Sequence, residues 1–219
     1  RFAKPPDFKF RAGQYLVLTL KDPPETDVEG NSRTFSIASA PSESDLTVAT
    51  RMRDTAFKRV MKRSPIGTEV KMDAPFGSLV LHDDPNRPAV FLAGGIGITP
   101  FRSILLQAFK DRLPHRLFLF YSNRRPQDAA FLEELEKKEK ENPNYKFIGV
   151  VSRAERSQAT WRGETGRINK EMLAHYLDGW AAPIYYVAGP PGMVTAMREM
   201  LALMGIDDSS IRAEEFDGY

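Results

Sequence analysis

The sequence predicts a two-domain protein in which a small antiparallel β-barrel precedes an α/β domain built on a parallel five-stranded sheet. Short strands separated by turns rich in proline and glycine fill the first part of the chain. Apolar strands then alternate with amphipathic helices, which is typical of a parallel sheet covered on both faces. The pattern changes near Asp84-Pro85-Asn86-Arg87-Pro88, so we expect domains over residues 1–85 and 86–219.

In the first domain the strands are indicated by strand-forming residues or by alternation of apolar and polar side chains, the period of a half-buried strand. Three segments carry these patterns, residues 14–20, 45–51 and 69–73. One short helix follows Thr55, which can cap it, and places Phe57, Val60 and Met61 on one face. This combination favours a small barrel.

The second domain alternates strands and helices to the end of the chain. Strands are expected over residues 88–93, 116–121, 145–151, 183–188 and 211–216. Helices are expected over residues 99–109, 127–140, 168–177 and 192–204. Pro100 would occupy the first helical position, where a missing N–H costs nothing, and Gly205 is a good C-terminal cap for the last helix.

Composition excludes several classes of protein. The 219 residues, 42% hydrophobic and 27% charged, are ordinary for a soluble globular chain, and no apolar run approaches the ~18 residues of a membrane span. The absence of cysteine excludes disulfides and cysteine-ligated clusters within this chain and fits a reducing, cytoplasmic location. Three isolated histidines, at 82, 115 and 175, lack metal-ligand spacing, so no metal is expected. A net charge of +2 gives no argument for nucleic acid.

Two glycine-rich turns follow strands of the second domain. Gly94-Gly95-Ile96-Gly97-Ile98-Thr99-Pro100 leads into a helix, whose N-terminal N–H groups and dipole favour a phosphate. It lacks the third glycine of the full dinucleotide fingerprint, so a plain tight turn stays open. Gly189-Pro190-Pro191-Gly192-Met193 follows a later strand, and by itself it could also be a second plain tight turn. Two such turns are what a dinucleotide needs, one for its pyrophosphate and one beside the nicotinamide.

Arg33-Thr34-Phe35-Ser36 is a third candidate segment, in the barrel domain. On a strand, Arg33 and Phe35 point to one face and Thr34 and Ser36 to the other. The segment brings a cation, an aromatic ring and a hydroxyl close together. Composition alone does not distinguish it from an ordinary strand.

In this order, the segments resemble the ferredoxin–NADP reductase family over nearly the whole chain. Residues 33–36 are similar to the family's Arg-x-Tyr/Phe-Ser/Thr flavin motif, and residues 94–100 to its nucleotide motif. Residues 189–193 are similar to its turn on the nicotinamide side. Gly13-Gln14-Tyr15 and Asp73-Ala74-Pro75-Phe76-Gly77 match a barrel strand start and the closing loop of the barrel.

The resemblance implies FAD as cofactor, NAD(P)H as hydride donor and a role for each matched position. Arg33 would hold the FAD pyrophosphate, Phe35 would pack beside the isoalloxazine, and Ser36 would hydrogen-bond near flavin N5. Thr50-Arg51-Met52 would line the flavin. Thr55-Ala56-Phe57 would begin a helix under the pyrophosphate.

The resemblance also covers the chain end, Glu214-Glu215-Phe216-Asp217-Gly218-Tyr219, where the family has an acidic-aromatic tail. Glu215 and Phe216 join Phe35 and Ser36 as the expected catalytic residues. Phe216 or Tyr219 would cover the flavin and move aside for the nucleotide, with structural packing of Phe216 as the alternative. Many members carry a cysteine where this chain has Ala188, so hydride transfer would depend on stacking geometry.

Two features bear on the nucleotide and on the partner. Ser122-Asn123-Arg124-Arg125 and Ser152-Arg153 follow two strands with cations and no carboxylate, which favours NADPH over NADH. Ser122, Arg124, Ser152 and Arg153 are therefore expected to bind the nucleotide. The basic residues 51, 53, 58, 59, 62 and 63 would dock an acidic one-electron carrier such as ferredoxin or flavodoxin. Phosphate binding or a solvated face is the alternative.

Three functions stay open at this point. The first is an independent NAD(P)H–flavin reductase that feeds a separate acceptor. The second is the reductase module of a larger oxygenase-type system, which Arg1-Phe2 keeps open because it reads as the middle of a strand. The third is a non-catalytic, flavin-binding regulatory module on the same fold, since fold alone does not determine function.

Overall fold

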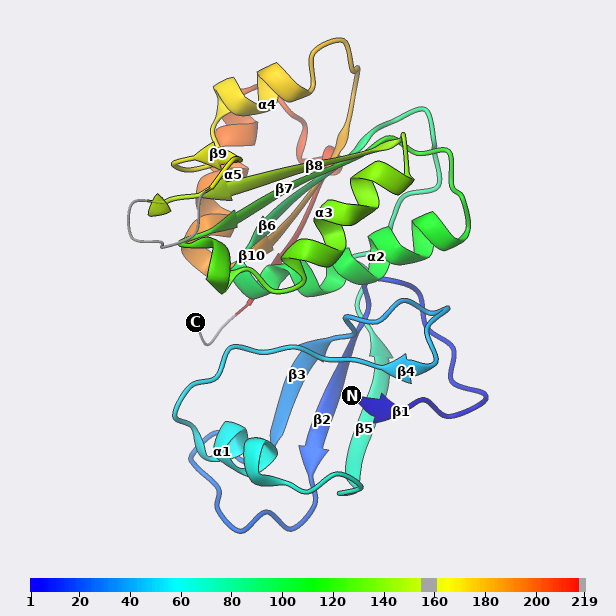
Figure 1. Ribbon diagram of the computed structural model, residues 1–219, viewed down its shortest axis with the longest axis vertical. Helices are drawn as coiled ribbons and strands as arrows, with labels where there is room; N and C mark the ends of the chain where they lie inside the picture. The colour runs from blue at the N-terminus through cyan, green and yellow to red at the C-terminus, as the bar shows by residue number, and fades with distance from the viewer. Residues whose placement is uncertain (155–160, 217–219) are drawn as a thin grey trace.

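The computed structural model describes residues 1–154 and 161–216, and Tyr219 lies outside them. A domain of short strands lies below a sheet domain whose helices α2 and α3 face it (Figure 1). Among the described residues, no helix combines the length and apolarity needed to cross a bilayer.

The first domain is built from two antiparallel sheets and one helix. Strands β2 (Tyr15–Leu20), β3 (Ser32–Ser36) and β5 (Val70–Phe76) form a sheet in the order β3-β2-β5. Strand β1 (Phe2–Ala3) pairs with β4 (Asp45–Leu46). Helix α1 (Ala56–Arg63) packs its buried residues against a core that includes Leu16, Leu18, Phe35 and Ile37. The alternating burial of β2 confirms the period of two in its sequence.

The second domain is a parallel sheet with helices on both faces. Its strands are β6 (Ala89–Gly94), β7 (Leu117–Asn123), β8 (Tyr145–Val151), β9 (Glu164–Thr165), β10 (Ile184–Gly189) and β11 (Ile211–Glu215). They run in the order β11-β10-β6-β7-β8-β9. Its helices are α2 (Ile98–Lys110), α3 (Leu132–Glu141), α4 (Lys170–Tyr176) and α5 (Pro191–Leu203). From β6 the chain adds β7, β8 and β9 on one side, and it then returns to place β10 and β11 on the other side of β6. This reversal creates a switch point at the carboxyl ends of β6 and β10.

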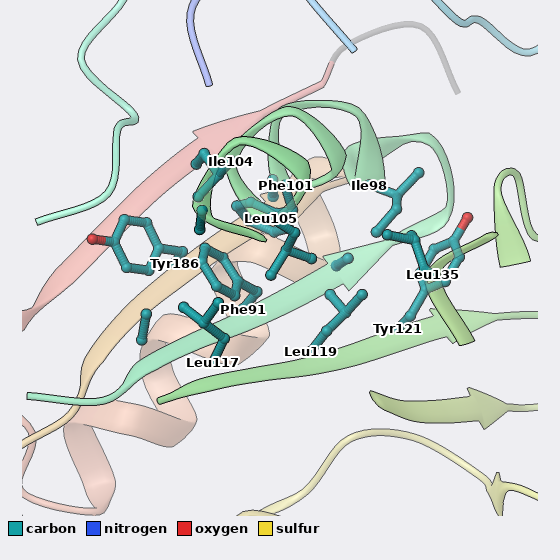
Figure 2. Packing of buried hydrophobic residues seen from close by; sticks show 14 of the residues in the cluster. Phe91, Ile98, Phe101, Ile104, Leu105, Leu117, Leu119, Tyr121, Leu135 and Tyr186 are labelled. Atoms are coloured by element: carbon teal, nitrogen blue, oxygen red, sulfur yellow. The ribbon is translucent and has the colours of Figure 1, made fainter. Parts of the chain in front are cut away.

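Two apolar cores lie on the two sides of this sheet. On the side of α2 and α3, Phe91, Leu119 and Tyr186 of the sheet pack with Phe101 and other side chains of α2 (Figure 2). On the side of α4 and α5, a second cluster forms around Val90, Leu92 and Leu173. The full burial of β6 and β10 explains why their sequences are continuously apolar rather than alternating.

Four sequence-based expectations need correction. The sheet has six strands rather than five, because the two-residue edge strand β9 is too short to leave a pattern. Only two residues of the expected strand 45–51 pair in a ladder, at β4. Helix α3 begins at Leu132 rather than near 127, because a 3₁₀ turn and a left-handed Phe131, with φ of 59°, precede it. Helix α2 begins at Ile98, two residues before Pro100. Pro100 still lies within the first turn, where backbone N–H groups have no acceptor inside the helix, so its missing N–H breaks no hydrogen bond.

Candidate functional site

A cleft of about 500 Å³ lies between the two domains and is lined by residues from both. From the barrel domain come the end of β3, the segment after β4 and the start of α1. From the sheet domain come the start of α2 and the end of β11. The sequence-predicted residues that line it are Arg33, Thr34, Phe35, Ser36, Thr50, Arg51, Thr55, Thr99, Glu215 and Phe216. The fold thus brings the strand motif, the first glycine-rich turn and the chain end together.

Ser36, at the end of β3, is the most informative residue of the cleft. It is 4% exposed, and its Oγ is buried without a hydrogen-bond partner among the described residues. An unpaired buried hydroxyl costs about 1–3 kcal/mol, so this atom fits a polar group bound in the cleft. Phe35 borders the cleft but lies mainly in the barrel core, with its ring 6.0 Å from that of Phe57.

Arg33 lies at the barrel end of the cleft, where the loop between β2 and β3 surrounds it. Its Nη2 lies 3.1 Å from Asp27 Oδ1 and 2.8 Å from Glu29 Oε2. Its Nη1 also donates to the backbone oxygen of Glu29 at 3.0 Å. The guanidinium lies over the Phe57 ring, 5.2 Å from its centroid. The Arg33 cation is therefore already paired with carboxylates of its own chain.

The N-terminus of α1 faces the same ion pair. Thr55 caps the helix by accepting the N–H of Lys58 at 3.3 Å, and the N–H of Ala56 donates to Asp27 Oδ2 at 3.1 Å. Desolvation would raise the pKa of Asp27, but hydrogen bonds from Ala56 and Arg33 lower it overall. A helix N-terminus and a guanidinium thus hold one anion together, an arrangement that fits a phosphate.

Lys58 and Arg53 also line the cleft, although the sequence motif did not include them. Lys58 Nζ donates to the backbone oxygen of Arg51 at 2.6 Å. Desolvation, followed by repulsion from Arg53 and Arg33, lowers the pKa of Lys58. The crowding of cations around one concavity favours an anionic ligand. The sequence signal for these two residues was the basic run over residues 51–63. Met52, expected to line the flavin, is 53% exposed and lies outside the cleft lining.

The two glycine-rich turns pack directly against each other. A Cβ at Gly97 would overlap the carbonyl of Ala188, and one at Gly189 would lie 3.1 Å from Gly94 Cα. A Cβ at Gly94 would overlap the sulfur of Met193. Side chains at Gly94, Gly97 and Gly189 would therefore push the two turns apart. Gly95, Ile98 and Pro100 are buried nearby, whereas Pro190 is partly exposed and Gly192 is exposed at the start of α5.

The chain end lies along the sheet-domain side of the cleft. The N–H of Phe216 donates to Gly189 O at 2.9 Å, and its side chain packs against the core under α2. Structural packing of Phe216 is thus present together with its place in the cleft. Glu215 is exposed, whereas Glu214 is half-buried, and burial raises the pKa of Glu214 to about 7. Glu214 was not among the expected site residues, because acidic neighbours in a sequence do not show which one is buried.

The residues expected to select the nucleotide lie elsewhere on the same carboxyl edge. The backbone N–H of Ser152 donates to Asn123 O at 3.0 Å, and that of Arg153 to Arg124 O at 2.9 Å. These bonds hold the ends of β7 and β8 side by side, and Arg124 and Arg153 are exposed. Ser122, Arg124, Ser152 and Arg153 are therefore grouped together but do not line the interdomain cleft.

Comparisons with known proteins agree with this architecture. Residues 91–199 match the oxidoreductase NAD-binding domain family. The chain is 27% identical over 210 residues to the terephthalate 1,2-dioxygenase reductase component 1 of a Comamonas species, covering 95% of this chain and 60% of the relative. It is 27% identical over 212 residues to the reductase subunit of the glycine betaine monooxygenase of Chromohalobacter salexigens, covering 95% of this chain and 56% of the relative.

A solved structure extends the likeness to both domains. The ferredoxin NADP+ reductase from Neisseria gonorrhoeae, with bound FAD and NADP, has a TM-score of 0.77 and 22% identity, covering 97% of this chain and 89% of that one. At this identity the likeness shows the fold. Fold, cleft and matched domain together define an oxidoreductase module with a nicotinamide-nucleotide domain. The chain thus carries the oxidoreductase NAD-binding domain over residues 91–199 and has the two-domain fold of the ferredoxin–NADP reductases.

Proposed function

We propose that this chain is a flavin-dependent oxidoreductase module that moves a hydride between NAD(P)H and a bound FAD and passes the electrons to a separate acceptor. The observation that supports it best is the buried Ser36 hydroxyl, which has no hydrogen-bond partner in the described part of the chain and lies in a cleft lined by both domains. Bound FAD would supply the redox chemistry by accepting a hydride from the nicotinamide and releasing electrons to the acceptor.

The residues of the chain would bind and orient the two ligands. Arg33 and the N-terminus of α1 would hold the pyrophosphate, replacing the carboxylate of Asp27. Ser36 would offer its hydroxyl to the flavin ring, and the segment Thr50-Arg51 would line the ring. The turns at residues 94–100 and 189–193 would hold the nucleotide at the switch point of the sheet. We place the division between the two functional units near residue 85.

The test is the colour of the purified chain and its response to reduced nucleotide. The proposal expects a yellow protein, as isolated or after addition of FAD, that NADPH or NADH bleaches without oxygen. Failure to bind FAD contradicts the proposal. A yellow protein that neither nucleotide bleaches contradicts it too, and favours the non-catalytic, flavin-binding module.

A larger oxygenase-type system is the second candidate. The chain spans about 60% of the length of the terephthalate dioxygenase reductase component it matches, so the electron acceptor of the whole protein can lie on another segment. Reduction of an added iron–sulfur or haem partner by the bleached chain would identify the class of acceptor. Reduction of small dyes alone would favour the independent reductase.

We also propose NADPH as the preferred nucleotide and an acidic one-electron carrier as the partner. The exposed guanidinium groups of Arg124 and Arg153 suit a 2′-phosphate. Lys62 and Arg63 are exposed on α1, next to the barrel end of the cleft, and could meet an acidic surface. Lys58 is less suited to this role, because it is half-buried and turned to Arg51.

A further inference from the structure

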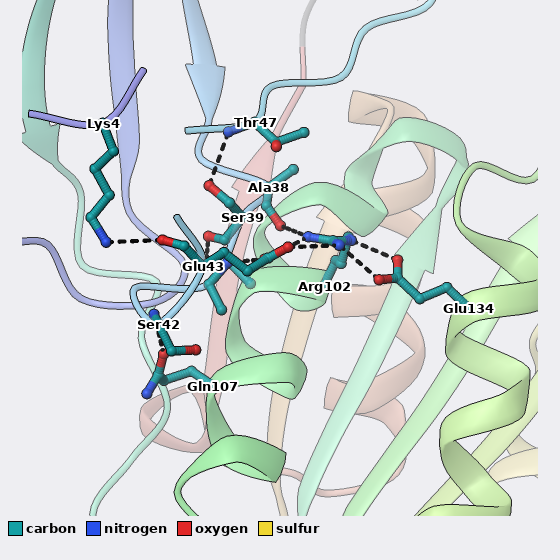
Figure 3. Close-up of polar contacts among 11 residues, drawn as sticks. Lys4, Ala38, Ser39, Ser42, Glu43, Thr47, Arg102, Gln107 and Glu134 are labelled. Atoms are coloured by element: carbon teal, nitrogen blue, oxygen red, sulfur yellow. Dashed lines mark hydrogen bonds and ion pairs between the residues drawn. The ribbon is translucent and has the colours of Figure 1, made fainter. Parts of the chain in front are cut away.

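Arg102 of α2 is a buried cation held by both domains (Figure 3). It is 7% exposed. Its Nη1 donates to Ala38 O at 2.7 Å and to Glu43 Oε2 at 3.0 Å, both in the barrel domain. Its Nε and Nη2 donate to the two carboxylate oxygens of Glu134 on α3, each at 2.7 Å. The guanidinium also lies 4.9 Å from the centroid of the Phe131 ring. One side chain therefore joins three separate segments.

The cluster sets one guanidinium, that of Arg102, between the carboxylates of Glu43 and Glu134 and fixes their geometry. Desolvation would lower the pKa of Arg102, but its hydrogen bonds to Glu134 and Glu43 raise it overall. Glu43 also accepts the N–H of Ala40 at 2.6 Å, which holds its carboxylate in place. A planar guanidinium bonded on several edges permits few orientations of its partners. Lysine, with one nitrogen, cannot reproduce this set of contacts.

Two further contacts on the same side of α2 bind the same barrel segment. Ser103 Oγ donates to Ser39 O at 2.7 Å, and Gln107 Oε1 accepts the N–H of Ser42 at 2.9 Å. The segment 38–43 is thus attached to α2 at successive turns. Arg102 is the one of these three side chains that also reaches α3.

The position of Arg102 relates this clamp to the cleft. Ala38 follows Ser36, the buried hydroxyl of the cleft, by two residues. Arg102 follows Gly97, in the turn packed on Ala188, by five residues of continuous helical backbone. The clamp therefore joins the flavin side of the cleft to the nucleotide side by a short covalent path at each end.

We propose that Arg102 is a positioning residue that sets the placement of the Ser36 strand against the Gly97 turn, and with it the alignment of the two ligands. The inference rests on the proposed function. Hydride transfer depends steeply on alignment, and a misplacement of about 1 Å can reduce a rate by about 100-fold. Loosening the clamp should therefore slow transfer between ligands that are both still bound.

The test compares Arg102→Met with Arg102→Lys, and uses Arg198→Met as control. Arg198 lies on α5, away from the clamp, and forms an exposed ion pair with Asp208. FAD and nucleotide affinities are measured first, and the rate of flavin reduction at saturating nucleotide is then measured by stopped flow. Arg102→Met should keep both affinities within about threefold and lose about 10- to 100-fold in rate, with Arg102→Lys between it and the wild type. An unchanged rate per bound flavin in Arg102→Met overturns the proposal.

A second readout does not need catalysis. Because the sequence has no cysteine, spin labels can be placed at introduced Lys71→Cys and Lys137→Cys, exposed positions on the two domains. The distribution of label distances should widen in Arg102→Met and stay narrow in Arg198→Met. If neither nucleotide reduces the flavin of the wild-type chain, the proposed function is wrong. The distribution of label distances then tests the clamp by itself, and an unchanged width in Arg102→Met overturns it. If Arg102→Met does not fold, Glu134→Gln replaces it in both measurements.

Discussion

Asp27 Oδ1 lies 3.1 Å from the Arg33 guanidinium, while the second oxygen of the same carboxylate accepts the N–H of Ala56 at 3.1 Å. The carboxylate thus fills the place where a helix N-terminus and a cation converge. A phosphate that binds there has to displace it.

We therefore expect Asp27→Asn to bind FAD more tightly than the wild type, because a neutral amide competes less well for Arg33. A gain of about three- to tenfold in affinity would be consistent with the loss of one partly buried ion pair. The ligand-free protein should become slightly less stable, since its helix N-terminus loses an anion. Flavin titration and thermal melts measure the two effects. Asp54→Asn, which removes a carboxylate paired with Arg59, is the control, and equal affinities in both variants would refute the competition.

Ser36→Ala should separate stability from catalysis. Removing a buried hydroxyl that has no partner among residues 1–154 and 161–216 should leave the ligand-free protein as stable or up to about 1 kcal/mol more stable. The same change should slow flavin reduction at saturating nucleotide by about 10- to 100-fold, through loss of a hydrogen bond to the flavin. Ser39→Ala is the matched control, because Ser39 Oγ accepts the N–H of Thr47 at 2.9 Å and its loss should destabilise. A reduction rate unaffected by Ser36→Ala would remove Ser36 from the site.

Glu214 should make stability depend on pH. Burial raises the pKa of its carboxyl to about 7 from an ordinary value of 4.5, so the unfolded chain ionises first as the pH rises. Its contribution is therefore complete below about pH 4.5 and is lost as the pH rises to 7, by at most about 3 kcal/mol. Glu214→Gln should flatten the curve of unfolding free energy in that range. Glu215→Gln, at an exposed neighbour, should keep the slope, and a slope retained in Glu214→Gln would exclude this assignment.

Arg153→Ala should raise the KM for NADPH far more than the KM for NADH, because only the former carries the 2′-phosphate. A loss of about tenfold would correspond to about 1.4 kcal/mol, in the range of a charge-assisted hydrogen bond. NADH serves as the internal control in steady-state kinetics. Equal effects on the two nucleotides would show that Arg153 does not read the phosphate.

Charge reversal at Lys62 should slow electron transfer to an acidic carrier, more at low than at high ionic strength, and leave dye reduction intact. Lys62 is the better choice than Lys58, whose half-buried amine lies in the cleft. Transfer rates to ferredoxin or flavodoxin across a salt series provide the measurement. Carrier kinetics that do not change at any salt concentration would exclude this face of α1 as the docking surface.

Much of the fold was predictable because burial leaves a periodic pattern. The alternation in β2 and the apolar runs of β6 and β10 correctly indicated a half-exposed and a fully covered sheet. The strand β9 escaped prediction because a two-residue edge pairing has no period. The start of α3 escaped because the left-handed conformation of Phe131 is imposed by its surroundings rather than by its side chain.

The sequence motifs indicated several residues of the cleft but not the electrostatics around them. Residues of the strand motif 33–36 and of the start of α2 line one cleft. The contact of the Asp27 carboxylate with Arg33 depends on the path of a loop, and the burial of Glu214 depends on how the folded chain packs around the end of β11. The Asp27–Arg33 contact and the burial of Glu214 both depend on segments distant in the sequence or on loop conformation, so no local sequence pattern predicts them.

The packing of Gly97 on Ala188 has a consequence for changing nucleotide preference. Because backbone meets backbone there, a side chain added at Gly97 would have to move the segment at Ala188. The two turns are consequently expected to keep a fixed position relative to each other within the sheet domain. If the proposed function holds, we therefore expect variation in coenzyme choice at Arg124 and Arg153, which are exposed and lie outside these packed turns.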